Sequence, residues 1–399
     1  MYMKLKKLTL NELSEKFEDY VVSIMAGKQN RLRDHLFRSF LFILSRLFRG
    51  IVLSRLMLYN ERIFRQHLLG CQIISVGNLT VGGTGKTPVV EFLTKTLLGR
   101  GRNVAIVSRG YRSKKKPFLQ KLKDKWQGKK EVPRVVSDGK EVLLDAEMGG
   151  DEPHMLAKNL LPAVVLVNKN RVMSCSYAIR NFASDIIILD DGFQYLRLRP
   201  SYNICLVDST NPFDNHHVLP RGLLREPIKN IKRANLIFLT KASQRRNLSH
   251  LKRFIRKHNR DAKIIECAHK PVRLTNVYDK DDTKGLDFLE GKRVASLSGI
   301  AVPTGFENSL GRLGAELIYK ERFADHHKFR DEEIQDCFNA SVEAGAEMIV
   351  TTEKDAVRIP DLGDRRIPIY YLKIEIGIFH GSDYFDEFIS RVLIEPKDI

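Results

Sequence analysis

From Gln72 onward the chain alternates short apolar runs with longer segments of helical periodicity. The apolar runs are QIISVGN, NVAIVS, AVVLVN, DIIILDD, NICLVD, NLIFLT and KIIECAH. Continuous apolar runs of this length are typical of strands that are buried on both faces of a parallel sheet. Because these strands alternate with helical segments, the pattern predicts a layered α/β domain.

A polar stretch at 279–291 interrupts this alternation, and a second series follows it with RVASLSGI, AELIYKERF, AEMIVTTEKD and PIYYLKIEI. This series is long enough for a smaller α/β domain, and a chain of 399 residues exceeds the usual size of one domain. We therefore predict four segments. They are a basic amphipathic helical region at 1–70, a first α/β domain at 71–270, a linker at 271–290 and a smaller α/β domain at 291–399.

The N-terminal region contains an apolar segment at 33–58 that arginines interrupt, so its uncharged runs are too short to span a bilayer. Two interpretations fit this pattern: a helix packed on the protein's own core, or a helix lying in a membrane interface with its arginines at headgroup level. The preceding residues do not resemble a signal peptide, since lysines are followed by a mixed acidic segment. We therefore expect a cytoplasmic protein.

The net charge of +19 indicates a polyanionic partner: nucleic acid, an anionic membrane surface or a phosphorylated substrate. A lysine-rich insertion at 112–134 is either a solvated loop or an electrostatic flap over an anionic partner. The five cysteines are widely separated, and none has the spacing of a zinc site. Their pattern favours a reducing compartment and no structural zinc.

The segment SVGNLTVGGTGKTPVV, residues 75–90, follows a predicted strand and precedes a predicted helix. It matches the phosphate-loop pattern G-x-x-x-x-G-K-[ST], except that Thr80 stands where the first glycine is expected. In this context backbone N–H groups and the helix N-terminus converge on phosphate oxygens. Lys86 would reach the terminal phosphates, and the Thr87 hydroxyl would bind Mg²⁺. The predicted nucleotide-binding residues are Thr80, Val81, Gly82, Gly83, Thr84, Gly85, Lys86 and Thr87.

A second motif, DIIILDDGFQY, ends an apolar strand in Asp190 and Asp191. Carboxylates at the tip of a buried strand form the Walker B arrangement, in which they lie near the metal of a phosphate loop. Taken alone, the same letters also fit a strand followed by an acidic turn. The two motifs together, in this order, predict nucleotide phosphoryl transfer.

Three further segments contain groups that could activate an acceptor or bind charge. GGDEPH places Asp151 at a helix start, where it is either a catalytic carboxylate or an N-cap. FADHHKF places two adjacent histidines beside a carboxylate, a pair that is either catalytic or inert. LPRGLLREP contains arginines that could bind phosphate or form a surface ion pair.

The motifs SVGNLTVGGTGKTP, SRGY, GDEP, LDDGFQ, LPRGLLREP, FADHH and TTEKDAV occur in the order seen in the tetraacyldisaccharide 4′-kinases, which this chain resembles from about residue 35 to about residue 375. The resemblance implies a two-domain P-loop kinase at the cytoplasmic face of the bacterial inner membrane. The implied reaction uses ATP and Mg²⁺ to phosphorylate the 4′-hydroxyl of a tetraacyldisaccharide 1-phosphate, forming lipid IVA in lipid A biosynthesis. The family also carries Ser or Thr where Thr80 stands.

The resemblance implies roles for individual residues. Lys86 and Thr87 would hold phosphates and Mg²⁺, and Asp190 and Asp191 would serve the metal side. Asp151 would be the catalytic base, supported by His326 rather than His327, although the sequence leaves these two histidines hard to separate. The implied neighbours of the substrate or nucleotide are Asn78, Tyr111, Arg225 and Glu226.

An anionic lipid and a nucleotide would both be attracted by the positive charge, which favours the interfacial helix for the segment at 33–58. We therefore predict a peripheral, monomeric enzyme that binds an anionic glycolipid and no nucleic acid. The insertion at 112–134 is longer than the family pattern, and the first 30 or so residues are extra. The alternative is a P-loop NTPase that acts as a hydrolytic switch and releases phosphate without any lipid.

Overall fold

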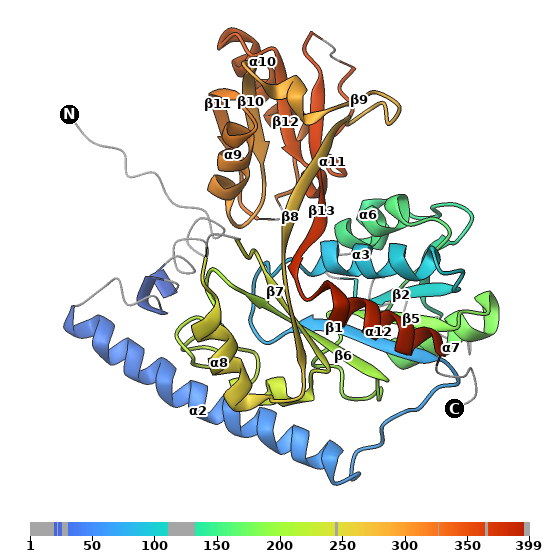
Figure 1. The fold of residues 1–399 in the computed structure, drawn as a ribbon. Helices are drawn as coiled ribbons and strands as arrows, with labels where there is room; N and C mark the ends of the chain where they lie inside the picture. Colours follow the sequence, from blue (N-terminus) through green and yellow to red (C-terminus); the bar gives the residue numbers. More distant parts are fainter. Residues whose placement is uncertain are drawn as a thin grey trace, which may run out of the picture.

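The computed structural model describes residues 20–21, 23–25, 31–110, 132–243, 246–325, 327–363 and 366–394. Tyr111, His326 and most of the lysine-rich insertion lie outside the described residues. Within these ranges the strands form one mostly parallel sheet, in which two long strands connect a larger and a smaller half (Figure 1). The predicted α/β fold with a second, smaller α/β part is confirmed.

The strand order in the sheet is β11-β10-β12-β13-β8-β7-β6-β1-β5-β2-β4-β3, with β9 paired to β8. The larger half contains β1 (Gln72–Asn78), β2 (Val104–Ser108), β3 (Arg134–Asp138), β4 (Val164–Val167), β5 (Ile186–Asp190), β6 (Tyr202–Asp208) and β7 (Leu236–Thr240). The two connecting strands are β8 (Lys263–Asn276) and β13 (Ile369–His380). The smaller half contains β9 (Thr283–Lys284), β10 (Arg293–Ser298), β11 (Glu316–Arg322) and β12 (Met348–Thr352).

The helices lie on both faces of this sheet. Those that precede β8 in the chain are α2 (Leu32–Asn60), α3 (Lys86–Leu98), α5 (Ala146–Gly149), α6 (Asp151–Asn159), α7 (Arg171–Phe182), the 3-10 helix η1 (Ile228–Arg233) and α8 (Ser249–His258). Those that follow β8 are the 3-10 helix η2 (Leu286–Leu289), α9 (Pro303–Arg312), α10 (Asp331–Glu343), α11 (Glu353–Ala356) and α12 (Ser382–Ile394).

The larger half is a parallel sheet whose central strands are apolar on both faces, as their continuous runs predicted. Ile74 and Ile188 pack in the core that includes α3, α6 and α12, whereas the next residues toward the other face pack with α7. β1 pairs in parallel with both β5 and β6. Because Val76 lies opposite Asp190 in this register, the segments that leave β1 and β5 start at the same edge of the sheet.

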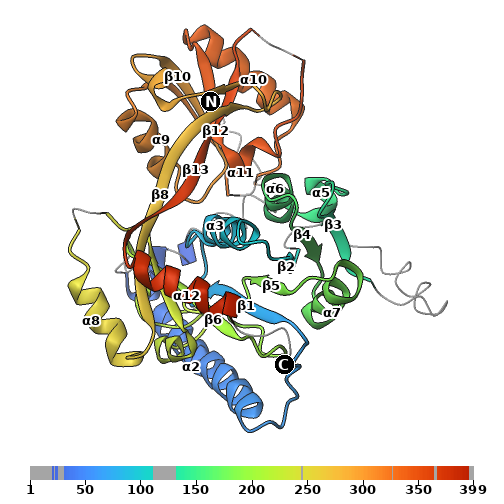
Figure 2. The ribbon, with the colours of Figure 1, turned by 45° about the vertical axis from the view of Figure 1, so that its right-hand side comes forward.

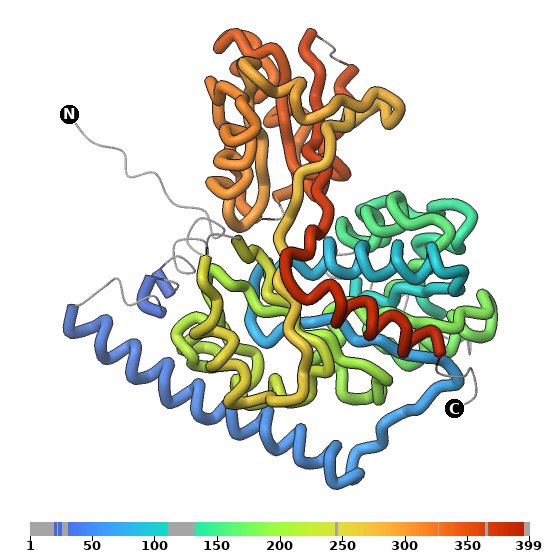
Figure 3. Tube along the Cα trace, viewed as in Figure 1, coloured from blue at the N-terminus to red at the C-terminus, as the bar shows by residue number. Residues whose placement is uncertain are grey.

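The two halves are joined by β8 and β13, which pair antiparallel from Asn276 opposite Tyr370 to Glu266 opposite His380. Figures 1 and 2 show these strands running side by side between the halves. The predicted linker at 271–290 therefore begins inside a strand. The chain trace in Figure 3 returns along β13 into α12, which packs on the larger half, with the Phe385 ring 4.8 Å from that of Phe92.

Helix α2 lies along the larger half (Figure 1). The Ser45 hydroxyl donates a 2.7 Å hydrogen bond to the carbonyl of Val218, and the Phe42 ring meets His217 edge to face at 5.6 Å. Much of its apolar surface stays exposed, at Leu32, Leu36, Phe40, Ile43, Leu47, Ile51 and Met57. Among the described residues, no helix combines the length and apolar character needed to cross a membrane.

Candidate active site

The phosphate loop connects β1 to α3 and turns on glycine. Gly82 and Gly85 have φ angles of 109° and 80°, in the left-handed region that residues with a side chain rarely adopt. A Cβ on Gly85 would also lie 3.1 Å from Nε2 of His269, so the position is sterically restricted. The carbonyl of Thr84 accepts a 2.8 Å hydrogen bond from the Thr240 hydroxyl, which anchors the end of the loop to β7.

Thr80, which occupies the position of the first expected glycine, does not have a positive φ. Its carbonyl accepts a 2.8 Å hydrogen bond from Nδ2 of Asn78, and its hydroxyl lies 3.3 Å from the same nitrogen. The N–H of Val81 donates to the carbonyl of Leu223 at 2.7 Å. Threonine is accommodated here because the entry to the loop is fixed by these contacts and does not require a left-handed residue.

Asp191 lies at the centre of a cluster of cationic side chains. Lys86 Nζ is 3.7 Å from Asp191 Oδ1 and 3.5 Å from Asn78 Oδ1, and Arg225 donates to both Asp191 oxygens at 2.8 Å. The Asp191 carbonyl accepts a 2.8 Å hydrogen bond from Arg171. Burial opposes ionisation of Asp191, but the charges of Lys86 and Arg225 outweigh it and lower the pKa of this carboxyl. The structure thus brings four of the predicted site residues together.

Asp190, the last residue of β5, is electrostatically the opposite of its neighbour. Its side chain is buried, and Oδ2 accepts a 3.1 Å hydrogen bond from the Ser108 hydroxyl. Burial, followed by the negative charges of Glu152 and Asp191, raises the pKa of Asp190 to about 6. A buried carboxylate next to a second carboxylate fits a hard divalent cation, for which the Thr87 hydroxyl would be a further oxygen donor. Among the described residues no three acidic, histidine or cysteine side chains are placed to hold a metal ion, so nucleotide phosphates and water would have to complete such a site.

Asp151 is the first residue of α6 and faces the smaller half. Its Oδ2 lies 3.7 Å from Nε of Arg358, which follows α11. The next residue, Glu152, lies 3.9 Å from Nζ of Lys354, and that ammonium is also 3.4 Å from Asp325 Oδ1. The segments GDEP, FADHH and TTEKDAVR, which are far apart in the sequence, therefore meet across the two halves.

The described histidine of FADHH is occupied within its own half. His327 Nε2 is 2.7 Å from Glu333 Oε2, and its ring stacks on Phe323 with centroids 4.7 Å apart. These contacts hold His327 against Glu333 and Phe323, so its side chain stabilises the smaller half locally. His326, the predicted partner of Asp151, lies outside the described residues, so its pairing stays a prediction.

Glu226 is buried beneath the loop that carries Arg225. Its carboxylate accepts hydrogen bonds from Asn230 at 2.8 Å and from Arg233 at 3.0 Å, and the Arg233 guanidinium lies 4.5 Å from the centre of the Phe193 ring. The side chain therefore fixes the loop from the inside. This arrangement gives Glu226 a supporting position behind Arg225.

Sequence reasoning missed four residues that contact the site: Ser108, Arg171, Gln194 and Arg358. Ser108 lies in SRGY, Gln194 lies in LDDGFQ, and Arg358 directly follows TTEKDAV, but the motifs did not assign a role to these three residues. Gln194 donates to the carbonyl of Asn78 at 2.9 Å and accepts from Arg225 at 3.3 Å. Arg171 opens α7 in no motif, and only the fold brings it to the Asp191 carbonyl.

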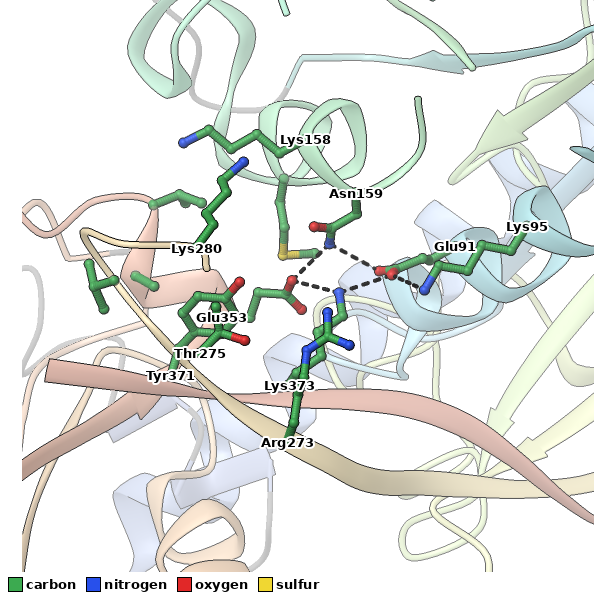
Figure 4. A pocket seen from close by; sticks show the side chains of 14 residues that line it. Glu91, Lys95, Lys158, Asn159, Arg273, Thr275, Lys280, Glu353, Tyr371 and Lys373 are labelled. Atoms are coloured by element: carbon green, nitrogen blue, oxygen red, sulfur yellow. Dashed lines mark hydrogen bonds and ion pairs between the residues drawn. The ribbon is translucent and has the colours of Figure 1, made fainter. Parts of the chain in front are cut away.

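A buried ionic network connects the phosphate-loop helix to the smaller half, as Figure 4 shows. Lys373 of β13 lies 2.9 Å from Glu91 of α3 and 2.6 Å from Glu353 of α11, and each of the three side chains is at most 10% exposed. Asn159, at the end of α6, donates to Glu353 at 2.8 Å. The network borders a cavity of about 260 Å³ and couples α3, α6, α11 and β13.

Comparisons with known proteins agree with this geometry. A family model described as "Tetraacyldisaccharide-1-P 4'-kinase" matches residues 37–394. A tetraacyldisaccharide 4'-kinase of Halothermothrix orenii is 32% identical over 381 residues, covering 92% of this chain and 96% of that protein. One from Anaeromyxobacter sp. (strain K) is 37% identical over 353 residues, covering 87% and 88%.

The crystal structure of LpxK from Aquifex aeolicus, described as an "apo" form in complex with ATP, superposes with a TM-score of 0.69. It is 26% identical to this chain, and the match covers 89% of this chain and 99% of that one. The phosphate loop, the paired aspartates, the fold and the extent of these matches lead to one conclusion. The chain belongs to the tetraacyldisaccharide-1-P 4'-kinase family.

Proposed function

We propose that this family member transfers the γ-phosphate of ATP to the 4′-hydroxyl of a tetraacyldisaccharide 1-phosphate through the residues described above. The observation that carries the proposal is the convergence of Lys86, Asp190 and Asp191 at one sheet edge, with Asp151 on the neighbouring helix start. In the reaction the 4′-oxygen forms a bond to the γ-phosphorus, and the bond from that phosphorus to the β–γ bridging oxygen breaks.

On the nucleotide side, the phosphates lie against the backbone of residues 80–87 and the start of α3. Lys86 and Arg225, which contact Asp191 in the structure, turn to the phosphates when the nucleotide binds. Asp190, Asp191 and Thr87 would hold Mg²⁺, which would supply positive charge to the transferring phosphoryl group. A nucleotide therefore exchanges one set of ion pairs for another, and the cationic side chains are positioned before it arrives.

On the acceptor side, Asp151 accepts the proton of the 4′-hydroxyl as the phosphoryl group is transferred. His326 of the smaller half would orient this carboxylate. The acceptor sugar would enter between the halves, so that the contact between them excludes water from the transferring phosphoryl group. Asn78, Tyr111 and Glu226 would act as neighbours of the site, Glu226 indirectly through Arg225.

Helix α2 would hold the enzyme on the cytoplasmic face of the inner membrane as a peripheral protein. Its exposed residues Leu36, Phe40, Ile43 and Leu47 recur at spacings of three and four, which places them on one face of the helix. Arginines lie among these apolar residues in the sequence and would contact anionic headgroups. An acylated product that carries two phosphates would leave the site most easily at such a surface.

The test is a transfer assay with radiolabelled ATP and tetraacyldisaccharide 1-phosphate. The wild type should transfer label to the lipid, whereas Asp151→Ala should lose at least ~10²-fold in kcat with little change in the KM for ATP. Lys229→Ala, which changes an exposed lysine on η1, is the matched control and should behave as the wild type. Wild-type enzyme that releases phosphate freely without lipid, and transfers none to it, would instead support the hydrolytic switch.

A further inference from the structure

Arg358 is a buried arginine at the contact between the two halves. Its side chain is 6% exposed, and one guanidinium nitrogen forms an ion pair with Asp355 of its own half. The carbonyl of His327 accepts a 2.7 Å hydrogen bond from Nη1, and the guanidinium lies 5.4 Å from the centre of the Phe329 ring. Arg358 thus holds the loop that carries FADHH from the side facing α6.

The remaining nitrogen of this guanidinium is not satisfied. Nε of Arg358 is buried and has no hydrogen-bond partner, although it lies 3.7 Å from Oδ2 of Asp151. That separation is longer than an N–H···O hydrogen bond, which is formed at about 2.7–3.2 Å. An unsatisfied buried N–H raises the free energy of the structure. A small approach of the two halves would let this N–H donate a charge-assisted hydrogen bond to Asp151, which would stabilise the closer arrangement.

The partner on the other side of Arg358 is rigidly held. Asp355 is fully buried, and Oδ2 accepts hydrogen bonds from the N–H of Gly299 at 3.0 Å and from the Thr352 hydroxyl at 2.7 Å. Because Asp355 is fixed by its own backbone turn, Arg358 has little freedom to move independently of the smaller half. The Arg358 side chain therefore moves together with the smaller half when that half moves relative to α6.

We propose that Arg358 is a positioning residue for phosphoryl transfer: it forms the contact by which the smaller half, on closing, orients the Asp151 carboxylate and keeps it ionised. This inference rests on the proposed function of Asp151 as the base. Arginine keeps its proton at working pH, so it acts by geometry and charge and does not carry the proton itself. Lysine could supply the charge but cannot reach three acceptors at once in the same plane.

Other charged groups surround the Asp151–Arg358 contact, and the test has to allow for them. They are Glu152 and Lys354, Asp325 beside Lys354, and Glu147 with Lys328 at 3.9 Å. A change in the overall charge of this area would shift the response to pH in any arginine variant. A double substitution that removes Asp151 separates the direct contact from this background.

The experiment compares Arg358→Gln and Arg358→Lys with wild type by kcat, both KM values and the pH profile of kcat, in full-length protein. Arg358→Gln should lower kcat by about 10–100-fold while the KM for ATP stays within about 2-fold. The acid limb of its profile should move to higher pH by about 1 unit, because a nearby cation favours the ionised carboxylate. Arg358→Lys should keep the acid limb near that of wild type and recover part of kcat. Arg312→Gln, an exposed arginine of the smaller half, is the matched control.

Additivity provides the second measurement. Adding Arg358→Gln to Asp151→Asn should lower kcat by less than about 2-fold, because the residue through which Arg358 acts is already absent. An unshifted acid limb, or a double variant in which the two losses multiply, would overturn the inference and leave Arg358 a structural residue. If Arg358→Gln fails to fold, Arg358→Lys becomes the test. Because lysine keeps the positive charge, an acid limb of Arg358→Lys that moves to higher pH by about 1 unit would contradict the role of charge. A wild type without any transfer to lipid would refute the proposed function itself.

Discussion

The proposed nucleotide side and the proposed acceptor side of the site are built in different ways. On the nucleotide side, the loop after β1 and the aspartates at the end of β5 belong to paired parallel strands, so the pairing of these two strands fixes their separation. On the acceptor side, Asp151 of the larger half meets Arg358 of the smaller half, and the distance between them depends on the β8–β13 connection. The first arrangement is rigid by construction, whereas the second changes whenever the two halves move.

This difference has a functional consequence. A phosphate site that is complete before the acceptor arrives can bind nucleotide in any arrangement of the halves. A base that is oriented from the other half is complete only when the halves approach, which would restrict transfer to the closed state. Substitutions on the two sides should therefore affect different kinetic parameters.

The largest effect is expected on the nucleotide side. Lys86→Ala removes the cation that lies 3.7 Å from Asp191 and that we propose binds the phosphates. We expect kcat/KM to fall by at least ~10³-fold, with a weaker affinity for ATP measured by calorimetry. Unchanged ATP affinity and a pure kcat defect would erase the distinction between the two sides.

The next effect concerns the network that connects the halves. Lys373→Met leaves Glu91 and Glu353 buried without their shared cation, and the free energy of unfolding should fall by about 3–5 kcal/mol in urea titrations. The exposed pair of Lys292 with Glu347 is the control, because Lys292→Met should lower the same quantity by less than about 1 kcal/mol.

The pH dependence of this defect has a definite sign. Burial raises the pKa of Glu353 even with Lys373 present, so the ionised form is penalised in the folded state. A raised folded pKa gives stability that is present at acid pH and is lost as the pH rises through that pKa. The Lys373→Met defect should therefore grow from pH 5 to pH 8, and a defect that is equal at both values would contradict the electrostatic explanation.

A third, smaller effect separates the two adjacent aspartates. Asp190 has a pKa raised to about 6, chiefly by burial, so its ionisation destabilises the folded protein above that pH. Asp190→Asn should raise the free energy of unfolding by roughly 1–3 kcal/mol at pH 8 and by less at pH 5, although transfer is lost. Asp191→Asn should instead destabilise, because it removes the partner of Lys86 and Arg225. Equal responses of the two variants would show that their environments do not differ.

The same contrast explains what the sequence could predict. The apolar runs specify the parallel strands, and residues such as Lys86 and Asp190 stand in contiguous motifs whose spacing reflects one strand and one turn. The roles of Arg358 and Lys373 could not be predicted from a motif. Their partners, Asp151 and Glu91, lie in other elements far away in the sequence. The linker predicted at 271–290 falls partly within β8, because this strand continues without a loop from a buried stretch at 264–267 through a more exposed stretch at 268–273 to a buried one at 274–275.

The smallest effect is expected outside the site, on α2. Phe40→Gln and Leu47→Gln together replace two exposed apolar side chains, at 53% and 62% exposure, without removing a charge. Burying one such side chain in an apolar phase is worth roughly 1.5–3 kcal/mol when complete. Partial burial at an interface should therefore make vesicle binding about 10-fold weaker for the double variant, measured by flotation with anionic vesicles.

The control is Leu143→Gln, which changes an exposed leucine elsewhere on the larger half and should bind vesicles as the wild type does. The kcat on substrate dispersed in detergent should be unchanged, because α2 contributes no side chain to the cluster around Asp191. Loss of detergent activity in the double variant would place α2 in the site and would end its separation from the two sides compared above.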